Sequence, residues 1–140
     1  HANNDAQGDY FNDLFITLDS LALELADRPG AAAGSTLLDE TVVVALSEMG
    51  RTPLINGADG KDHWPVTSAM IFGAGVAGQR AVGATDDFLL ARDIQLDTGE
   101  PDAGGEPLHP ENLHAGLLEL VGVDPSLQYP GVTPLRGFHG

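Results

Sequence analysis

The chain has 140 residues, which is the size of one domain and long enough to bury a hydrophobic core. Its formal net charge is −15, from six Lys and Arg against 21 Asp and Glu. This balance argues against nucleic-acid binding, which needs clustered cations, and favours solubility first and cation binding second. The absence of cysteine excludes disulfides and thiolate metal sites, and no run approaches the ~20 apolar residues of a membrane span.

Residues 8–25 form the clearest predicted helix, with an apolar stripe that repeats at helical spacing. The stripe consists of Phe11, Leu14, Phe15, Leu18, Leu21, Ala22 and Leu25. Acidic side chains lie largely off the stripe, and an Arg-Pro-Gly sequence at residues 28–30 ends the helix. We expect this helix to cover one face of a sheet.

Two apolar runs, residues 41–46 and 68–72, are predicted strands. The first, Thr-Val-Val-Val-Ala-Leu, shows no polar alternation, which is typical of an interior strand buried on both faces of a parallel sheet. A helix followed by such a strand is half of a right-handed crossover unit. Residues 79–85 are a weak third candidate strand.

The rest of the chain is predicted to be irregular except for one more helix. Residues 86–106 are acidic, and we expect Phe88, Leu89 and Leu90 to anchor this segment to the core. Pro110 suits a helix start, and Gly122 followed by Pro125 suits its end. The apolar stripe of this helix consists of Leu113, Leu117, Leu118 and Val121.

The loop that follows residues 41–46 carries the candidate chemistry, since ligands collect outside the carboxyl ends of strands in open α/β sheets. Glu48, Asp62 and His63 supply metal-ligand types on this short segment. Arg51 has two interpretations that remain equally open, an oxyanion clamp or a salt bridge to Glu48. Asn56 is interpreted first as a turn-former.

The same segment resembles a large family of exported bacterial sulfatase-like proteins, mostly of unknown function, in the alkaline phosphatase superfamily. The resemblance rests on Ser-Glu-Met-Gly-Arg-Thr-Pro at residues 47–53, Asn56, and Gly-Lys-Asp-His-Trp-Pro at residues 60–65. It continues through residues 73–76, 82–86, 110–114 and 122–124, in order along nearly the whole chain. His1 corresponds to the last residue of the Asp-Thr-His of that family.

This resemblance implies that divalent metal ions act as cofactors, held by Glu48, Asp62, His63 and His1, with Arg51 as the catalytic residue. Glu48 stands where the superfamily has an Asp, and Met49 replaces the usual metal-binding His. Methionine is a poor ligand for hard divalent cations. A different registration makes Asp62 and His63 themselves the Asp-His pair, and both registrations stay open.

The resemblance further implies an α/β fold, the three-layer alkaline-phosphatase-like architecture, of which residues 1–140 are the C-terminal portion. The nucleophile of the superfamily lies upstream of the matched region, so we expect the missing N-terminal part of the same protein as a partner. The implied function is metal-dependent hydrolysis of a sulfate or phosphate ester, small-molecule or glycan, in an exported protein. The alternative is a non-catalytic exported binding or structural protein that retains the fold.

Overall fold

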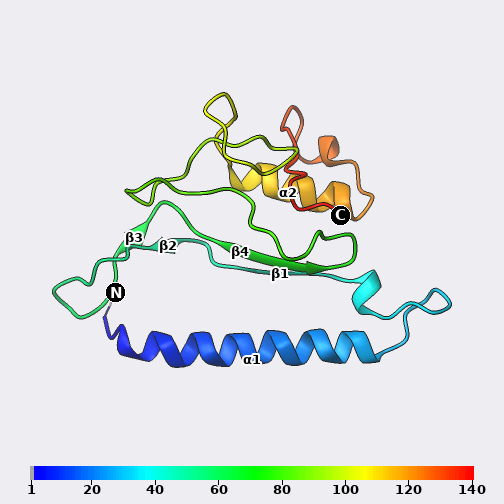
Figure 1. Ribbon diagram of the computed structural model, residues 1–140, viewed down its shortest axis with the longest axis horizontal. Coiled ribbons are helices and arrows are strands. Elements are labelled where there is room, and N and C mark those ends of the chain that lie inside the picture. The colour runs from blue at the N-terminus through cyan, green and yellow to red at the C-terminus, as the bar shows by residue number, and fades with distance from the viewer. Residues whose placement is uncertain (1) are drawn as a thin grey trace. The chain divides into compact units, whose positions relative to one another are not determined.

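The computed structural model describes residues 2–140 and divides the chain into two compact units, His1–Ala74 and Gly75–Gly140. The first unit contains helix α1 (Asp5–Asp27), the short 3-10 helix η1 (Leu38–Glu40) and four strands (Figure 1). The second unit contains helix α2 (Pro110–Leu120) and the 3-10 helix η2 (Pro125–Leu127). The chain is therefore a mixture of helices and small antiparallel sheets, which agrees with the predicted α/β class at that level.

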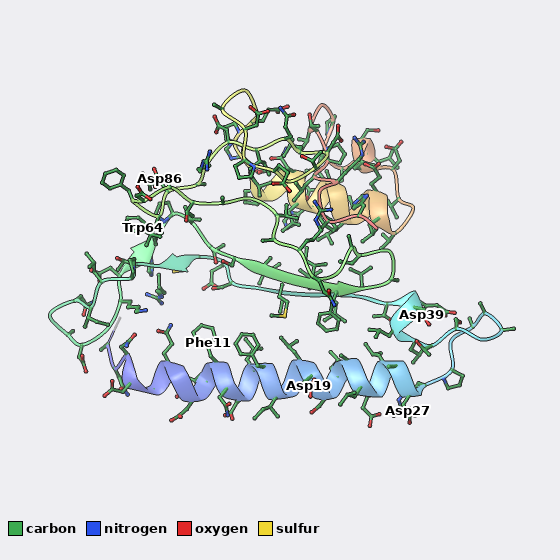
Figure 2. The ribbon with its side chains drawn as sticks, viewed as in Figure 1. Phe11, Asp19, Asp27, Asp39, Trp64 and Asp86 are labelled. Atoms are coloured by element: carbon green, nitrogen blue, oxygen red, sulfur yellow. The ribbon has the colours of Figure 1, made fainter. Side chains whose placement is uncertain are left out.

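Helix α1 confirms the predicted first helix and extends it by three residues at the start and two at the end. Phe11 lies on the side of the helix that faces the sheet of the first unit (Figure 2), and its ring stacks on Phe15 with centroids 6.4 Å apart. However, no residue of α1 is buried, and the Phe15 side chain is 52% exposed. The apolar stripe is thus correctly located, but it is not covered as we expected.

The two predicted strands are present, but their arrangement differs from the prediction. Strand β1 (Val42–Leu46) pairs antiparallel with β4 (Ala69–Gly73), with Val42 opposite Gly73 and Leu46 opposite Ala69. The pair forms a two-stranded sheet, and β1 is half-buried with Leu46 exposed. The expectation of a parallel strand buried on both faces is therefore wrong for the residues described.

The direction of β4 follows from the segment that connects it to β1. Parallel neighbours need a crossover, usually a helix, whereas antiparallel neighbours do not. Residues 47–68 contain no helix; instead they form a second small hairpin of β2 (Gly50–Arg51) and β3 (His63–Trp64). The chain therefore runs out through this hairpin and returns antiparallel to β1.

Helix α2 begins and ends where Pro110 and Gly122 indicated, and Gly122 has a φ of 78° directly after the C-cap Val121. The buried face of α2, however, consists of Asn112, Ala115 and Gly116, and the leucines of the predicted stripe are only half-buried. The small residues let the C-terminal segment approach. The Leu135 N–H donates to the Asn112 carbonyl at 2.9 Å, and Asn112 Nδ2 donates to the Thr133 carbonyl at 2.8 Å.

Apart from Ala115 of α2, the core of the second unit comes from segments that were predicted to be irregular. Its buried apolar side chains are Ile94, Leu96, Ala115, Leu135 and Phe138. Phe88 is 79% exposed, so the expected anchor of residues 88–90 is wrong. Residues 79–85 form no strand, and only Thr85 makes an isolated bridge, to Ala91.

Of the helices described, none has both the length and the hydrophobicity needed to cross a membrane.

Candidate functional site

Asn56 organises the loop between β2 and β3. Its Oδ1 accepts hydrogen bonds from the N–H groups of Ala58, at 2.9 Å, and Gly60, at 3.0 Å. Its Nδ2 donates to Asp62 Oδ1 at 2.9 Å, and its N–H donates to the Gly60 carbonyl at 2.8 Å. The interpretation of Asn56 as a turn-former is confirmed. Through these bonds one side chain fixes the path of the backbone into Lys61.

The β2–β3 hairpin sets Arg51 directly opposite His63. Gly50, next to Arg51, is buried against the following chain, since a Cβ there would overlap the Val66 carbonyl oxygen. The Thr52 N–H donates to the Asp62 carbonyl at 3.0 Å and continues the pairing beyond the strands. The position of Arg51 is thus determined by backbone contacts on both sides.

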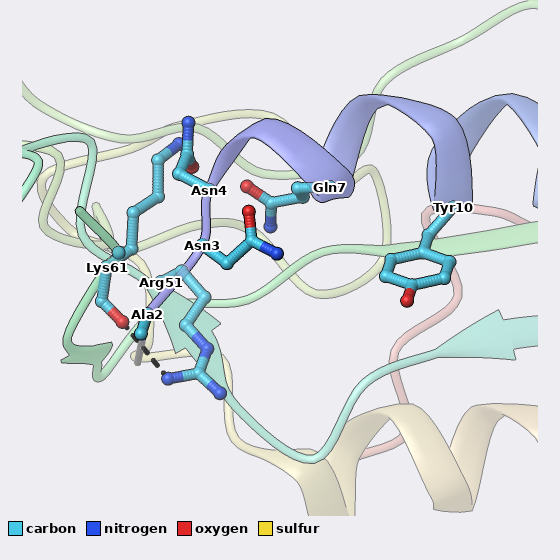
Figure 3. Close-up of a pocket in the computed structure, with 8 residues that line it drawn as sticks. Ala2, Asn3, Asn4, Gln7, Tyr10, Arg51 and Lys61 are labelled. Atoms are coloured by element: carbon cyan, nitrogen blue, oxygen red, sulfur yellow. Dashed lines mark hydrogen bonds between the residues drawn. The ribbon is translucent and has the colours of Figure 1, made fainter. Parts of the chain in front are cut away.

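Arg51 and Lys61 both line one recess in the first unit, where the Lys61 side chain extends toward Asn4 and the Arg51 guanidinium lies at the Lys61 backbone (Figure 3). Arg51 Nη1 donates to the backbone carbonyl of Lys61 at 3.1 Å. The recess has a volume of about 200 Å³, and the start of α1 forms its other wall. The lining residues are Ala2, Asn3, Asn4, Gln7, Tyr10, Arg51, Gly60 and Lys61.

The start of α1 is attached to the loop by a backbone contact. The Asn4 N–H donates to the Asp59 carbonyl at 2.7 Å, and Asp59 has a φ of 56°, in the left-handed region. This bond brings the amide side chains around the N-cap of α1 beside Arg51 and Lys61. The start of α1 and the loop between β2 and β3 form the two walls of the recess, and this hydrogen bond joins them.

Two basic residues line the recess, although the protein as a whole is strongly acidic. Arg51 and Lys61 are two of the three Lys and Arg residues between positions 2 and 74, and no Asp or Glu lines the recess. The amino end of α1 adds the partial positive charge of the helix dipole, with Asp5 in the first turn as the nearest opposing group on that helix. Two cations and a helix terminus at one hollow favour an anion.

One of the two interpretations of Arg51, a salt bridge to Glu48, can be compared with the structure. Among residues 2–140, the guanidinium forms no salt bridge to Glu48 or to any other carboxylate. Its side-chain hydrogen bond goes to a neutral carbonyl, and the side chain is exposed. The positive charge of Arg51 is therefore not neutralised by a carboxylate of the described chain.

Glu48, Asp62 and His63, the predicted metal ligands within the described residues, have different local surroundings. Glu48 is exposed before β2 and accepts from Ser47 Oγ at 3.3 Å, Asp62 is held by Asn56, and His63 is exposed on β3. No three His, Cys, Asp or Glu side chains between residues 2 and 140 are grouped so that they could hold a metal ion. His1, the fourth predicted ligand, lies outside the described residues.

Sequence reasoning located Arg51 but missed its neighbours at the recess. Asn3, Asn4 and Gln7 stand in a polar run before and inside the first helix, which carries no periodic signal of a site. These three side chains lie at the recess because the Asn4 N–H is hydrogen-bonded to the Asp59 carbonyl, which is 55 residues away in the chain. The usable signal was the scarcity of cations, which makes the pair Arg51 and Lys61 conspicuous.

A family model described as "Protein of unknown function (DUF1501)" matches residues 33–133. The matched range includes Arg51 and Lys61, and it excludes α1 with the amide side chains of the recess. No curated protein and no solved structure matches the chain.

Proposed function

Within the family of proteins of unknown function (DUF1501), to which this chain belongs, we propose that the chain binds a sulfate or phosphate ester through its oxyanion. The observation that carries the proposal is the recess lined by Arg51 and Lys61 without an acidic side chain. Arginine presents a planar fork that matches two oxygens of such a group, and lysine adds a mobile point charge. The two side chains would hold the anion from the loop side, opposite the start of α1.

The strength of this binding follows from the number of contacts. Two or three charge-assisted hydrogen bonds contribute about 1.5–3 kcal/mol each, before the cost of association. Arg51 is exposed and Lys61 half-buried, so water competes for both side chains. For a bare inorganic anion we therefore expect a dissociation constant of about 1 mM, which corresponds to about 4 kcal/mol.

We further propose that the whole protein hydrolyses the bound ester with divalent metal ions. This step rests on the resemblance to the alkaline phosphatase superfamily, which also supplies the proposals of that fold, of export and of a catalytic upstream part. The ligands proposed for these ions are Glu48, Asp62, His63 and His1.

The second candidate function is anion binding without catalysis. Met49 favours it, because methionine stands where the superfamily has a metal-binding His and is a poor ligand for hard divalent cations. The two candidates share the anion recess and differ only in whether the bound ester is then hydrolysed.

The anion site is tested by calorimetric titration of the 140-residue chain with inorganic sulfate and phosphate at constant ionic strength. We expect Arg51→Ala and Lys61→Ala each to weaken binding at least tenfold. Arg28→Ala is the matched control, because Arg28 is an exposed arginine paired with Glu24 near the end of α1 and should not alter binding. Equal affinities for the parent chain and both site variants would reject the anion site.

The two candidate functions are distinguished in the natural full-length protein. Two tightly held divalent ions per chain, with hydrolysis of 4-nitrophenyl sulfate or 4-nitrophenyl phosphate, would support the hydrolase. Zero or one ion without hydrolysis would support the binding protein. Metal content by mass spectrometry and release of 4-nitrophenol provide the two readouts.

A further inference from the structure

The neutral side chains of the recess indicate what the rest of the bound ester is. Beside the two cations, the recess is lined by three amides, Asn3, Asn4 and Gln7, and by the phenol of Tyr10. We infer that the alcohol half of the ester is a small hydroxyl-rich group, such as one sugar ring, and not an alkyl or aryl group. This inference rests on the proposed function of the recess as an oxyanion site.

The amides are available for a ligand. Within residues 2–140, the side chains of Asn3 and Gln7 make no hydrogen bond, and Figure 3 shows their amide groups pointing toward one another above Arg51. Asn4 Oδ1 is shielded from solvent and accepts no hydrogen bond from the described chain. A shielded acceptor without a donor costs about 1–3 kcal/mol. A ligand hydroxyl that enters beside Asn4 supplies that donor after a rotation of the amide.

An amide and a hydroxyl are complementary because each can both donate and accept. An alkyl or aryl group at the same place would displace water from Asn3 and Gln7 and leave their polar atoms unpaired. Sites that hydrogen-bond a substrate hydroxyl discriminate against analogues that lack it for this reason. Ala2 is the one aliphatic residue named in the lining, and the Tyr10 side chain is 73% exposed, so neither encloses an apolar group of a ligand.

The volume limits the size of the group. Pockets for drug-sized ligands measure about 300–1,000 Å³, whereas this recess measures about 200 Å³. It therefore suits an anion with one ring-sized polyol, and any longer glycan would extend into solvent. Because the recess is open, we expect the hydroxyl groups to contribute about a tenfold gain in affinity, well below the discrimination of enclosed sites.

The test compares three probes that share the phosphate group: inorganic phosphate, ethyl phosphate and glucose 6-phosphate. Titration of the 140-residue chain should give similar affinities for the first two and an affinity at least tenfold higher for glucose 6-phosphate. Gln7→Met keeps side-chain length and helix propensity in α1 but removes the amide. This variant should lose most of the preference for glucose 6-phosphate and retain its affinity for ethyl phosphate.

The outcomes separate this inference from the proposed function. If none of the three probes binds, the anion site itself is wrong, and the inference fails with it. If ethyl phosphate and glucose 6-phosphate bind equally, the anion site stands and the polyol inference is overturned. Retention of the full preference by Gln7→Met, or loss of inorganic phosphate binding by that variant, would also overturn the inference, because Gln7 would not be acting on hydroxyl groups.

Discussion

Glu40 shows how a single carboxylate stabilises an irregular segment of the first unit. Its Oε2 accepts from the Ala31 N–H at 2.8 Å and its Oε1 from the Ala32 N–H at 3.0 Å, while Ser35 Oγ donates a third, short hydrogen bond. The two backbone donors and the serine lower the pKa of Glu40 from 4.5 to about 2. Hydrogen bonds to the charged form have this effect because protonation removes the acceptor.

The lowered pKa of Glu40 predicts how the stability of the chain depends on pH. Since the folded pKa lies below the unfolded one, the contribution of Glu40 is fully present above about pH 4.5 and is lost as the pH falls toward 2. Glu40→Gln should therefore lower the Tm at pH 7, and its difference from the parent chain should shrink over that pH range. Thermal unfolding by circular dichroism at a series of pH values measures this.

A suitable control for this prediction is Glu48→Gln. Glu48 is exposed, and its one side-chain hydrogen bond, from Ser47, has a length of 3.3 Å. The Tm of this variant should follow that of the parent chain at every pH. A Glu40→Gln difference that stays constant down to pH 2 would contradict the assignment of the low pKa to Glu40.

At the scale of elements, the packing of α2 depends on the absence of a side chain at Gly116. A Cβ there would overlap the Leu135 carbonyl oxygen and lie 3.2 Å from Phe138 Cε1. Gly116→Ala should therefore destabilise the second unit by about 1–3 kcal/mol, the usual cost of overpacking, despite the better helix propensity of alanine. Chemical unfolding monitored by helical circular dichroism would report the loss.

Gly8 provides the matched control, because it also lies inside a helix but has nothing within 4 Å of the position of a Cβ. Gly8→Ala should raise stability by about 0.5–1 kcal/mol through helix propensity alone. If the two variants change stability equally, propensity governs both positions, and the close approach of residues 133–138 to α2 is wrong.

Local sequence signals predicted where the helices and strands lie, but they did not predict how these elements pair and pack. Both helices were located correctly, because apolar periodicity, Pro110 and Gly122 are local signals. The runs that became β1 and β4 were also located, but their pairing direction depends on the connection, where the absence of helical periodicity is the signal for an antiparallel pair. The helix packing was missed because Asn112 and Gly116 form contacts through their backbones with residues far along the chain.

The candidate site was predictable to a similar extent. Arg51 could be singled out because few cations occur in the chain, and Asn56 because its turn chemistry is local. The Asn4–Asp59 hydrogen bond positions the segment that carries Asn3 and Gln7 at the site. No periodic pattern in the sequence predicts that bond. The metal site stays a prediction, since Glu48, Asp62 and His63 are not grouped within the described residues.

At the scale of the whole molecule, the first unit exposes a large apolar surface. Its exposed side chains include Tyr10, Phe11, Leu14, Phe15, Ile16, Leu21, Leu23, Leu46 and Met70. Both strands of the β1–β4 sheet also have one edge without a partner strand among the described residues. Large exposed apolar patches mark protein–protein, membrane or ligand interaction sites, and an open strand edge can pair with another chain. That an upstream part of the protein or another chain covers this surface stays a prediction.

This surface leads to a prediction for the 140-residue chain alone. It should bind the neutral dye Nile red with an increase in fluorescence, and Phe15→Glu should reduce the increase because it places a charge in the middle of the α1 stripe. Leu127→Glu, at an 81% exposed position of the second unit, should have little effect. A monomer that unfolds cooperatively and binds no dye would show instead that the chain is a self-sufficient small domain.

Nuclear magnetic resonance can locate an anion at the recess formed by Arg51, Lys61 and the start of α1. Inorganic sulfate is titrated into the ¹⁵N-labelled chain, with sodium chloride at equal ionic strength as the reference. We expect saturable shifts of the backbone amide signals of residues 3–7 and 51–61, with the signals of residues 28–40 and 75–140 unchanged. Shifts that are absent from residues 3–7 and 51–61, or that are spread evenly over the chain and reproduced by chloride, would contradict the anion site.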